Sequence, residues 1–239
     1  MSIYRAHSHR NGVPATPQEL RSRGVRRLWI VTLCLVVLCG AGVVGWQLIK
    51  ASQPKPMPTP AGVSNDGGEQ GGMTVAGNGP TTVEVYFDLL CGNCRLVQSS
   101  LGTTLDDLAA QNRIRLVWHP VAVNNGLTNP PGYATRAANA VACAADFHKA
   151  REFAAALYEN VPRAGTAGPN DDQLIDLAGP VGLNAPAFAQ CVREMRYEQW
   201  IGVVGQRAAQ RGLPTLPAIY VNGTPLDQPT STALNIALR

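Results

Sequence analysis

The sequence predicts an α/β domain with a helical insertion, joined by a flexible linker to one membrane-spanning helix. Three observations lead to this prediction. Residues 28–49 carry no formally charged side chain, residues 50–80 are rich in Pro, Gly and Ser, and strand-like and helix-like segments alternate over residues 81–239. A chain of 239 residues has room for one sizeable domain beside such extensions.

Residues 28–49 have the length and composition of a transmembrane helix. At about 1.5 Å per residue the run reaches about 33 Å, which exceeds a hydrocarbon core of about 30 Å. Trp29 and Trp46 stand near its two ends, where membrane-interface aromatics are found. A cleaved signal peptide is the alternative, but its apolar region is usually only about 7–15 residues long. We therefore expect an uncleaved, single-pass anchor.

The distribution of charge predicts the orientation of this anchor and argues against nucleic-acid binding. Residues 1–50 hold seven Lys and Arg against one acid, whereas the remainder holds thirteen against fifteen. The basic residues precede the span, so the positive-inside rule predicts a cytoplasmic tail over residues 1–27 and an extracytoplasmic body. The body shows no interleaving of basic and aromatic residues, so we expect no nucleic-acid partner.

The linker and the body differ in composition. Segment 50–80 cannot bury enough apolar surface to order itself, so it is interpreted as a flexible linker. Within the body, β-branched and aromatic runs predict strands, and apolar residues at helical spacing predict helices. A helical insertion is expected over about residues 128–210. The predicted segments are a strand at 81–90, a helix at 94–112, a strand at 113–123, helices within 131–210, a strand at 216–223 and a helix at 230–238.

Cys91 and Cys94 form a C-x-x-C pair at a predicted strand-to-helix junction. The first turn of a helix has unsatisfied N–H groups and a partial positive charge, which stabilise a thiolate. The thiolate is the form that attacks a disulfide. Cys91 is therefore the candidate nucleophile, and Cys94, one turn further on, is the candidate resolving cysteine.

The same spacing also occurs in metal sites and in structural disulfides. Structural zinc usually needs four ligands, and no second C-x-x-C pair is present in the body. His119 and His148 are single and unpatterned, so we expect no metal site and no other cofactor. Cys34 and Cys39 fall in the apolar run and are interpreted as packing residues. A membrane-tethered metallochaperone and a peptide-binding module with inert cysteines remain the alternatives to a redox enzyme.

The body resembles the thioredoxin fold, and in particular the DsbA-like thiol–disulfide oxidoreductases. The resemblance lies in "YFDLLCGNC" at residues 86–94 and in the proline before "AIYVNG" at 218–223. It implies that Pro217 is a cis-proline and that Leu216 and Pro217 form one wall of the substrate groove. Pro214 lies three residues too early for this position. Cis bonds are far more accessible to proline than to other residues.

The same resemblance suggests which residues influence the proton movement and the redox potential of the Cys91–Cys94 pair. It implies a role for Asp88 in proton movement near Cys91, with an exposed acid at a strand end as the alternative interpretation. Gly92 and Asn93 supply neither the proline nor the histidine of the strongly oxidising members of the family. We therefore expect a milder redox potential than that of the strongest oxidants.

Cys143 and Cys191 fall in separate helical segments of the predicted insertion. In an oxidising compartment two such cysteines are often bonded, and similar relatives carry a second disulfide there. We expect a structural disulfide, with two free buried thiols as the alternative.

The function that these residues and the resemblance imply is disulfide chemistry on exported proteins. Cys91 reacts with the substrate and Cys94 resolves the mixed disulfide. A redox partner in the membrane must then reset the pair. The sequence leaves open whether the enzyme forms, reduces or isomerises disulfides.

Overall fold

The structure, a computed structural model, describes residues 29, 46, 50, 56–63, 71–213 and 215–239. The chain divides into two units, residues 1–56 and 57–239, and each is considered by itself. In the first unit Trp29, Trp46 and Lys50 are helical, and the Lys50 ammonium lies 4.2 Å from the centroid of the Trp46 ring.

Most of the predicted membrane span, residues 28–49, lies outside the described residues, as do Cys34 and Cys39. Within the part of the chain that is described, no helix is both long and apolar enough to cross a membrane. The anchor and the cytoplasmic tail 1–27 therefore stay predictions.

The second unit is built on a five-stranded sheet of order β1-β3-β2-β4-β5. The central strands β2 and β3 run parallel, and every other neighbouring pair runs antiparallel. The two parallel strands need a crossover connection, which helix α2 supplies. The strands are β1 (Met73–Ala76), β2 (Thr81–Phe87), β3 (Ile114–Pro120), β4 (Ala218–Val221) and β5 (Thr224–Pro225). The predicted central strands are confirmed with shorter bounds.

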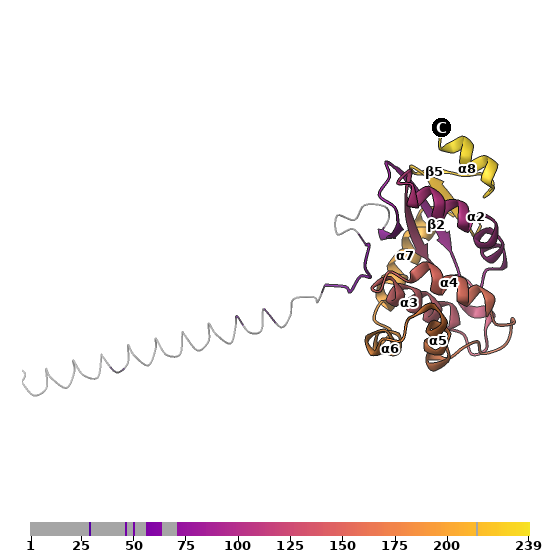
Figure 1. Cartoon of the computed structure of the whole chain (residues 1–239). Helices are drawn as coiled ribbons and strands as arrows, with labels where there is room; N and C mark the ends of the chain where they lie inside the picture. Colours follow the sequence, from indigo (N-terminus) through magenta and orange to yellow (C-terminus); the bar gives the residue numbers. More distant parts are fainter. Residues whose placement is uncertain (1–28, 30–45, 47–49, 51–55, 64–70, 214) are drawn as a thin grey trace, which may run out of the picture. The chain divides into compact units, whose positions relative to one another are not determined.

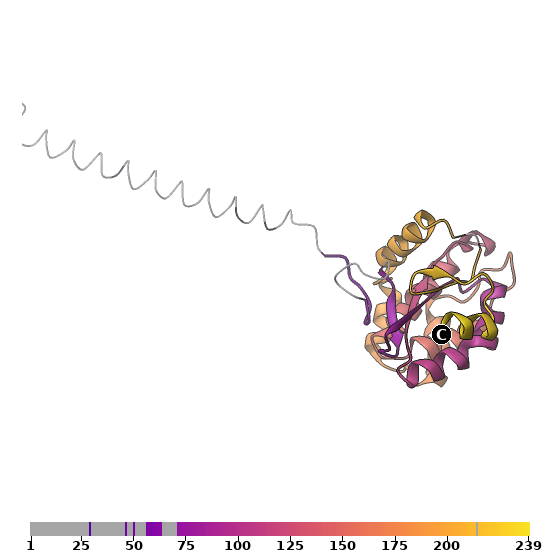
Figure 2. The ribbon, with the colours of Figure 1, turned by 90° about the horizontal axis from the view of Figure 1, so that it is seen from above.

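Alternation along β2 assigns its two faces to two different helices. Val85 and Phe87 line a small cavity together with residues of α2 (Gly92–Ala110), so that face lies under α2. Glu84 and Tyr86 point the other way and bind Arg211, which directly follows α7 (Glu198–Gln210). Figure 2 shows α2 and α7 on opposite sides of the sheet.

The helices between β3 and β4 form the expected insertion. Figure 1 shows α3, α4, α5 and α6 gathered at the end of the domain away from the C-terminal helix α8. Eleven of the 13 residues of α3 are buried and seven of these are alanine, which lets α4, α6 and α7 pack closely against it. The remaining elements are η2 (Asn125–Leu127), α3 (Tyr133–Ala145), α4 (Ala150–Glu159), α5 (Asp171–Ala178), η3 (Gly179–Val181), α6 (Pro186–Arg193) and α8 (Ser231–Ala237).

The prediction of a flexible linker over residues 50–80 is wrong in its last part. Residues 73–76 form β1, which pairs antiparallel with β3 through a register that includes Trp118, and the first residue of β1 is fully buried. The indole N–H of Trp200 also donates to the carbonyl oxygen of Gly71 at 3.0 Å. A four-residue strand among glycines has the composition of a linker. It is ordered because β3 offers it an edge to pair with.

Candidate active site

The turn between β2 and α2 is held together by the carboxylate of Asp88. Its Oδ1 accepts a hydrogen bond from the N–H of Leu90 at 2.7 Å, and its Oδ2 accepts one from the N–H of Asn124 at 2.8 Å. Its carbonyl oxygen accepts from the Tyr158 hydroxyl at 3.2 Å and from the N–H of Cys91 at 3.1 Å. Asp88 therefore fixes the backbone on which the cysteine pair stands.

Asp88 is fully buried, so the alternative of an exposed acid at the strand end is wrong. Burial raises the pKa of its carboxyl, although the backbone N–H donors of Asn124 and Leu90 act in the opposite direction. The burial of this acid could not be read from the sequence, because it depends on Asn124 after β3 and Tyr158 on α4 closing over it.

Cys91 is the N-cap residue of α2, and its Sγ accepts a hydrogen bond from the N–H of Cys94 at 3.0 Å. The two cysteines are joined by a disulfide with a Cα–Cα distance of 5.1 Å. On reduction the sulfur of Cys91 would face the free N–H groups of the helix start, which stabilise its thiolate. Cys91 is 9% exposed and Cys94 is 3% exposed, so Cys91 is the more accessible sulfur.

The loop after α7 brings Leu216 against the pair. The Sγ of Cys91 lies 3.6 Å from the carbonyl oxygen of Leu216, and the Leu216–Pro217 peptide bond is cis. Pro217 lines the small cavity beside Cys94. The structure thus brings Pro217 and Leu216, which is 125 residues from Cys91 in the sequence, next to the cysteine pair, as the resemblance implies. Pro214 lies outside the described residues.

Gly92 and Asn93 occupy the first turn of α2 and are both exposed. A Cβ built on Gly92 would meet no atom within 4 Å, so this side of the pair is open. Neither residue carries a charge, and the first turn of α2 contains no acidic residue.

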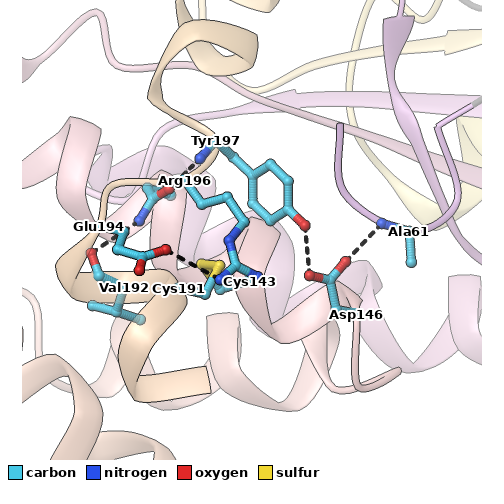
Figure 3. Close-up of a disulfide and its surroundings, with 9 residues drawn as sticks. Ala61, Cys143, Asp146, Cys191, Val192, Glu194, Arg196 and Tyr197 are labelled. Carbon is cyan, nitrogen blue, oxygen red and sulfur yellow. Dashed lines mark hydrogen bonds and ion pairs between the residues drawn. A yellow bond between two sulfur atoms is a disulfide. The ribbon is translucent and has the colours of Figure 1, made fainter. Parts of the chain in front are cut away.

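The second predicted disulfide, Cys143–Cys191, joins α3 to α6 with a Cα–Cα distance of 5.9 Å (Figure 3). Both cysteines are buried, with exposed fractions of 0% and 1%. Beside it the buried Asn139 side chain accepts from the N–H of Tyr197 at 2.8 Å and donates to the carbonyl oxygen of Val192 at 3.4 Å. These bonds tie α3 to the last turn of α6 and to the start of α7, and the buried disulfide joins α3 and α6 at the same place.

Figure 3 also shows how a segment before the sheet is tied to the insertion. The carboxylate of Asp146 accepts hydrogen bonds from the Tyr197 hydroxyl at 2.5 Å and from the N–H of Ala61 at 3.0 Å. Met57 and Val63 pack against the core. The described stretch 57–63, predicted as linker, therefore packs against the rest of the second unit.

A buried charged cluster on the α7 face of the sheet was not predicted from the sequence. The Arg211 guanidinium lies 3.1 Å from each carboxylate oxygen of Glu84 and donates to the Tyr86 hydroxyl at 2.9 Å. His119, which is fully buried, stacks on Tyr86 with ring centroids 4.0 Å apart. Because Arg211 begins the loop that leads to Leu216, this cluster fixes one end of that loop. In the sequence, Glu84 within the otherwise uncharged strand β2 was the feature that could have indicated this cluster.

The pKa values in this cluster follow from burial and from these contacts. Burial alone would raise the pKa of Glu84, but the contact with the His119 imidazole and the charge and hydrogen bonds of Arg211 outweigh it and lower that pKa. Burial lowers the pKa of His119 below its ordinary value and outweighs the carboxylate of Glu84. Burial also raises the pKa of Tyr86 to about 12. His119 is thus kept neutral near pH 7, beside an ion pair of Glu84 and Arg211.

Among the described residues no group of three or more His, Cys, Asp and Glu side chains is arranged to hold a metal ion. His119 contacts Glu84 and His148 is exposed, so neither joins a cysteine in such a group.

Comparison with protein families identifies the fold. The family model described as Thioredoxin matches residues 71–238, which is more than half of the chain. The chain belongs to the thioredoxin family. Comparison with curated proteins found no match. The start of the match at residue 71 agrees with β1 being part of the domain.

Solved structures of this family place the chain among its DsbA-like members. DsbG and DsbA from Mycobacterium tuberculosis, both in reduced form, are each 28% identical with a TM-score of 0.58. The match covers 66% of this chain and 76% and 80% of those two chains. BdbD from Bacillus subtilis, in oxidised form, is 14% identical with a TM-score of 0.59, covering 77% of this chain and 97% of that one, and shows the fold alone.

These neighbours and the C-x-x-C pair at the start of α2 together support a thiol–disulfide oxidoreductase of the DsbA-like type.

Proposed function

We propose that this protein is a membrane-anchored thiol–disulfide oxidoreductase that forms, reduces or isomerises disulfides of exported proteins outside the cytoplasm. The observation that carries the proposal is the Cys91–Cys94 disulfide at the start of α2, with Leu216 beside its outer sulfur. The backbone N–H of Leu216 has no hydrogen-bond partner in the described part of the chain. It can therefore receive an extended substrate segment as a strand does.

The reaction balances through the two sulfurs of the pair. In the oxidising direction a substrate thiolate attacks the Sγ of Cys91, the Cys91–Cys94 bond breaks, and Cys94 leaves as a thiolate. A second substrate thiolate then attacks the substrate sulfur of the mixed disulfide, and Cys91 leaves in turn. Two electrons pass from the substrate dithiol to the pair, and reduction of a substrate runs the same steps in reverse.

The location outside the cytoplasm is supported by three features. Arginines precede the apolar run 28–49, which favours a cytoplasmic N-terminus. The M. tuberculosis structures with 28% identity bear the names of disulfide-bond enzymes. The buried Cys143–Cys191 disulfide suits an oxidising compartment. A membrane redox partner resets the pair: a quinone-linked protein for an oxidase, or a transmembrane electron donor for a reductase.

Two assays test this proposal against its alternatives: insulin reduction, and refolding of a reduced, unfolded ribonuclease. We expect the wild type to catalyse at least one of them and Cys91→Ser to lose that activity. Cys94→Ser should accumulate the mixed disulfide with substrate, because the resolving sulfur is gone. A peptide-binding module would fail both assays in the wild type. A metallochaperone would instead bind metal in a titration that depends on Cys91.

A further inference from the structure

The side chain of Arg211 joins the end of α7 to two neighbouring strands of the sheet. Its guanidinium lies 3.1 Å from each carboxylate oxygen of Glu84 on β2, and its central carbon lies 3.6 Å from the centroid of the Tyr220 ring on β4. Glu84 and Tyr220 are opposite each other in the antiparallel pairing of these strands. The same guanidinium donates to the carbonyl oxygen of Gly223, directly before β5, at 3.3 Å.

These contacts are largely shielded from water. The side chain of Glu84 is 6% exposed and that of Arg211 is 18% exposed. An ion pair in such surroundings is screened by salt much less than a surface pair is. The guanidinium above the Tyr220 ring adds a cation–π contact, and its planar fork can bind several acceptors at once. The position of Arg211 against the sheet is therefore well defined.

The loop of residues 212–216 leads from Arg211 to Pro217. Gly212, with a φ of +69°, turns the chain away from the helix axis directly after Arg211. In the rest of the loop, the described residues make no backbone–backbone hydrogen bond with the described part of the chain. The end at Pro217 is held by the pairing of β4 with β2, and the end at Arg211 by the contacts above. The position of Leu216 therefore depends on how these two ends are placed.

The carbonyl oxygen of Leu216 faces the sulfur that reacts. It lies 3.6 Å from the Sγ of Cys91, where the thiol of the reduced pair can donate a weak hydrogen bond to it. Its partial negative charge opposes a thiolate on that sulfur, against the effect of the N–H groups at the start of α2. A less stable thiolate makes the reduced pair less stable and the disulfide less oxidising.

We propose that Arg211 is a positioning residue for disulfide exchange, which fixes the loop between α7 and β4 so that the carbonyl oxygen of Leu216 lies against the Sγ of Cys91. The inference rests on the proposed function, because the contact matters only if the Cys91–Cys94 pair is oxidised and reduced. Arg211 acts through Leu216 and not through its own charge. In the described part of the chain, its side-chain hydrogen bonds end on β2 and on the turn after β4.

Arg211→Gln in the full-length chain tests this role. The rate at which Cys91 is alkylated, measured against pH by mass spectrometry, gives the pH at which half of this thiol is thiolate. Glutathione buffers give the oxidation equilibrium of the pair. We expect the half-thiolate pH to fall by about half a unit and the equilibrium to shift about threefold toward the dithiol. The shift is moderate because Leu213 and Leu216 still pack against the core.

The sign of the shift separates positioning from a direct effect of charge. Loss of a positive charge alone would disfavour the thiolate and raise the half-thiolate pH. Arg207→Gln is the matched control, because Arg207 is a half-buried arginine one turn earlier on α7 whose guanidinium lies beside Gly71. This variant removes the same charge and leaves the loop anchored, so its half-thiolate pH should equal or exceed that of the wild type.

Two further variants keep the test valid if Arg211→Gln folds poorly. Arg211→Lys retains the charge but lacks the planar fork, so it should shift the half-thiolate pH in the same direction as Arg211→Gln. The double variant Glu84→Gln/Arg211→Gln leaves no buried carboxylate without a partner, and its half-thiolate pH should also fall. Chemical denaturation of each variant checks that the measurements are made on folded protein.

The outcomes separate this inference from the proposed function. A half-thiolate pH that is unchanged or raised in folded Arg211→Gln overturns the inference, while the chemistry of Cys91 stands. An equal decrease in Arg207→Gln also overturns it, because a general loosening of α7 would then be the cause. A wild type in which the Cys91–Cys94 pair does not exchange with glutathione overturns the proposed function itself.

Discussion

At the scale of the residue, Asp88 organises the approach to the cysteine pair. Its two carboxylate oxygens receive the N–H groups of Leu90 and Asn124, and its carbonyl receives that of Cys91. A buried donor that loses its acceptor costs about 1–3 kcal/mol. The carboxylate therefore stabilises the turn even though burial opposes its ionisation.

Asp88→Ala should lower the free energy of unfolding by about 2–4 kcal/mol, because it leaves two N–H groups without acceptors. Chemical denaturation measures this loss. Asp107→Ala is the control, since Asp107 is exposed on α2, and it should lie within about 0.5 kcal/mol of the wild type. Equal stability of Asp88→Ala and the wild type would contradict the role given to this carboxylate.

At the scale of the element, the Cys143–Cys191 disulfide fastens α3 to α6 within the insertion. The closed loop spans a sequence separation of 48. The chain-entropy account gives such a loop about 4 kcal/mol of stabilisation through the unfolded state. The elements that carry Cys91 and Cys94 lie outside this loop.

The double variant Cys143→Ala/Cys191→Ala should therefore unfold at lower denaturant concentration, with a loss of about 4 kcal/mol or less. Its Cys91–Cys94 pair should still exchange with glutathione. Denaturation and alkylation mapping check the two expectations. Loss of exchange in a folded double variant would show that the second disulfide takes part in the chemistry.

At the scale of the whole molecule, the cluster of Glu84, Arg211 and His119 ties the sheet to α7 and makes stability depend on pH. The pKa of His119 is lowered by burial, so the unfolded chain takes up the proton first as pH falls. The pKa of Glu84 is also lowered, and its contribution is lost as pH falls through 4.5 and below. Both groups therefore make the folded protein less stable in acid.

The free energy of unfolding should decrease as pH falls below about 6.5, the ordinary pKa of histidine. His119→Asn should flatten the part of this dependence between pH 6.5 and 5. Denaturation curves at several pH values measure this dependence. An unaltered pH profile in His119→Asn would refute the contribution assigned to His119.

The sequence was sufficient for the parts of the fold and the site that local chemistry determines. The C-x-x-C pair and its strand and helix follow from short motifs, whereas the place of Pro217 beside the pair follows from the resemblance to a known family. The Glu84–Arg211 ion pair depends on the packing of α7 against the sheet, because its two partners are 127 residues apart in the sequence. Strand β1 depends on the edge of β3. Contacts between segments so far apart in the sequence produce no recognisable pattern within either segment.

Equilibration of the purified chain with glutathione buffers, followed by quenching and peptide mapping, shows directly which cysteines exchange. We expect a reversible two-electron exchange confined to Cys91 and Cys94, absent in Cys91→Ser, while Cys143–Cys191 stays bonded. Its midpoint should lie at a more negative potential than the about −120 mV of the strongest oxidants. A Cys91–Cys94 disulfide that does not exchange at any glutathione ratio would show that this pair is not redox-active.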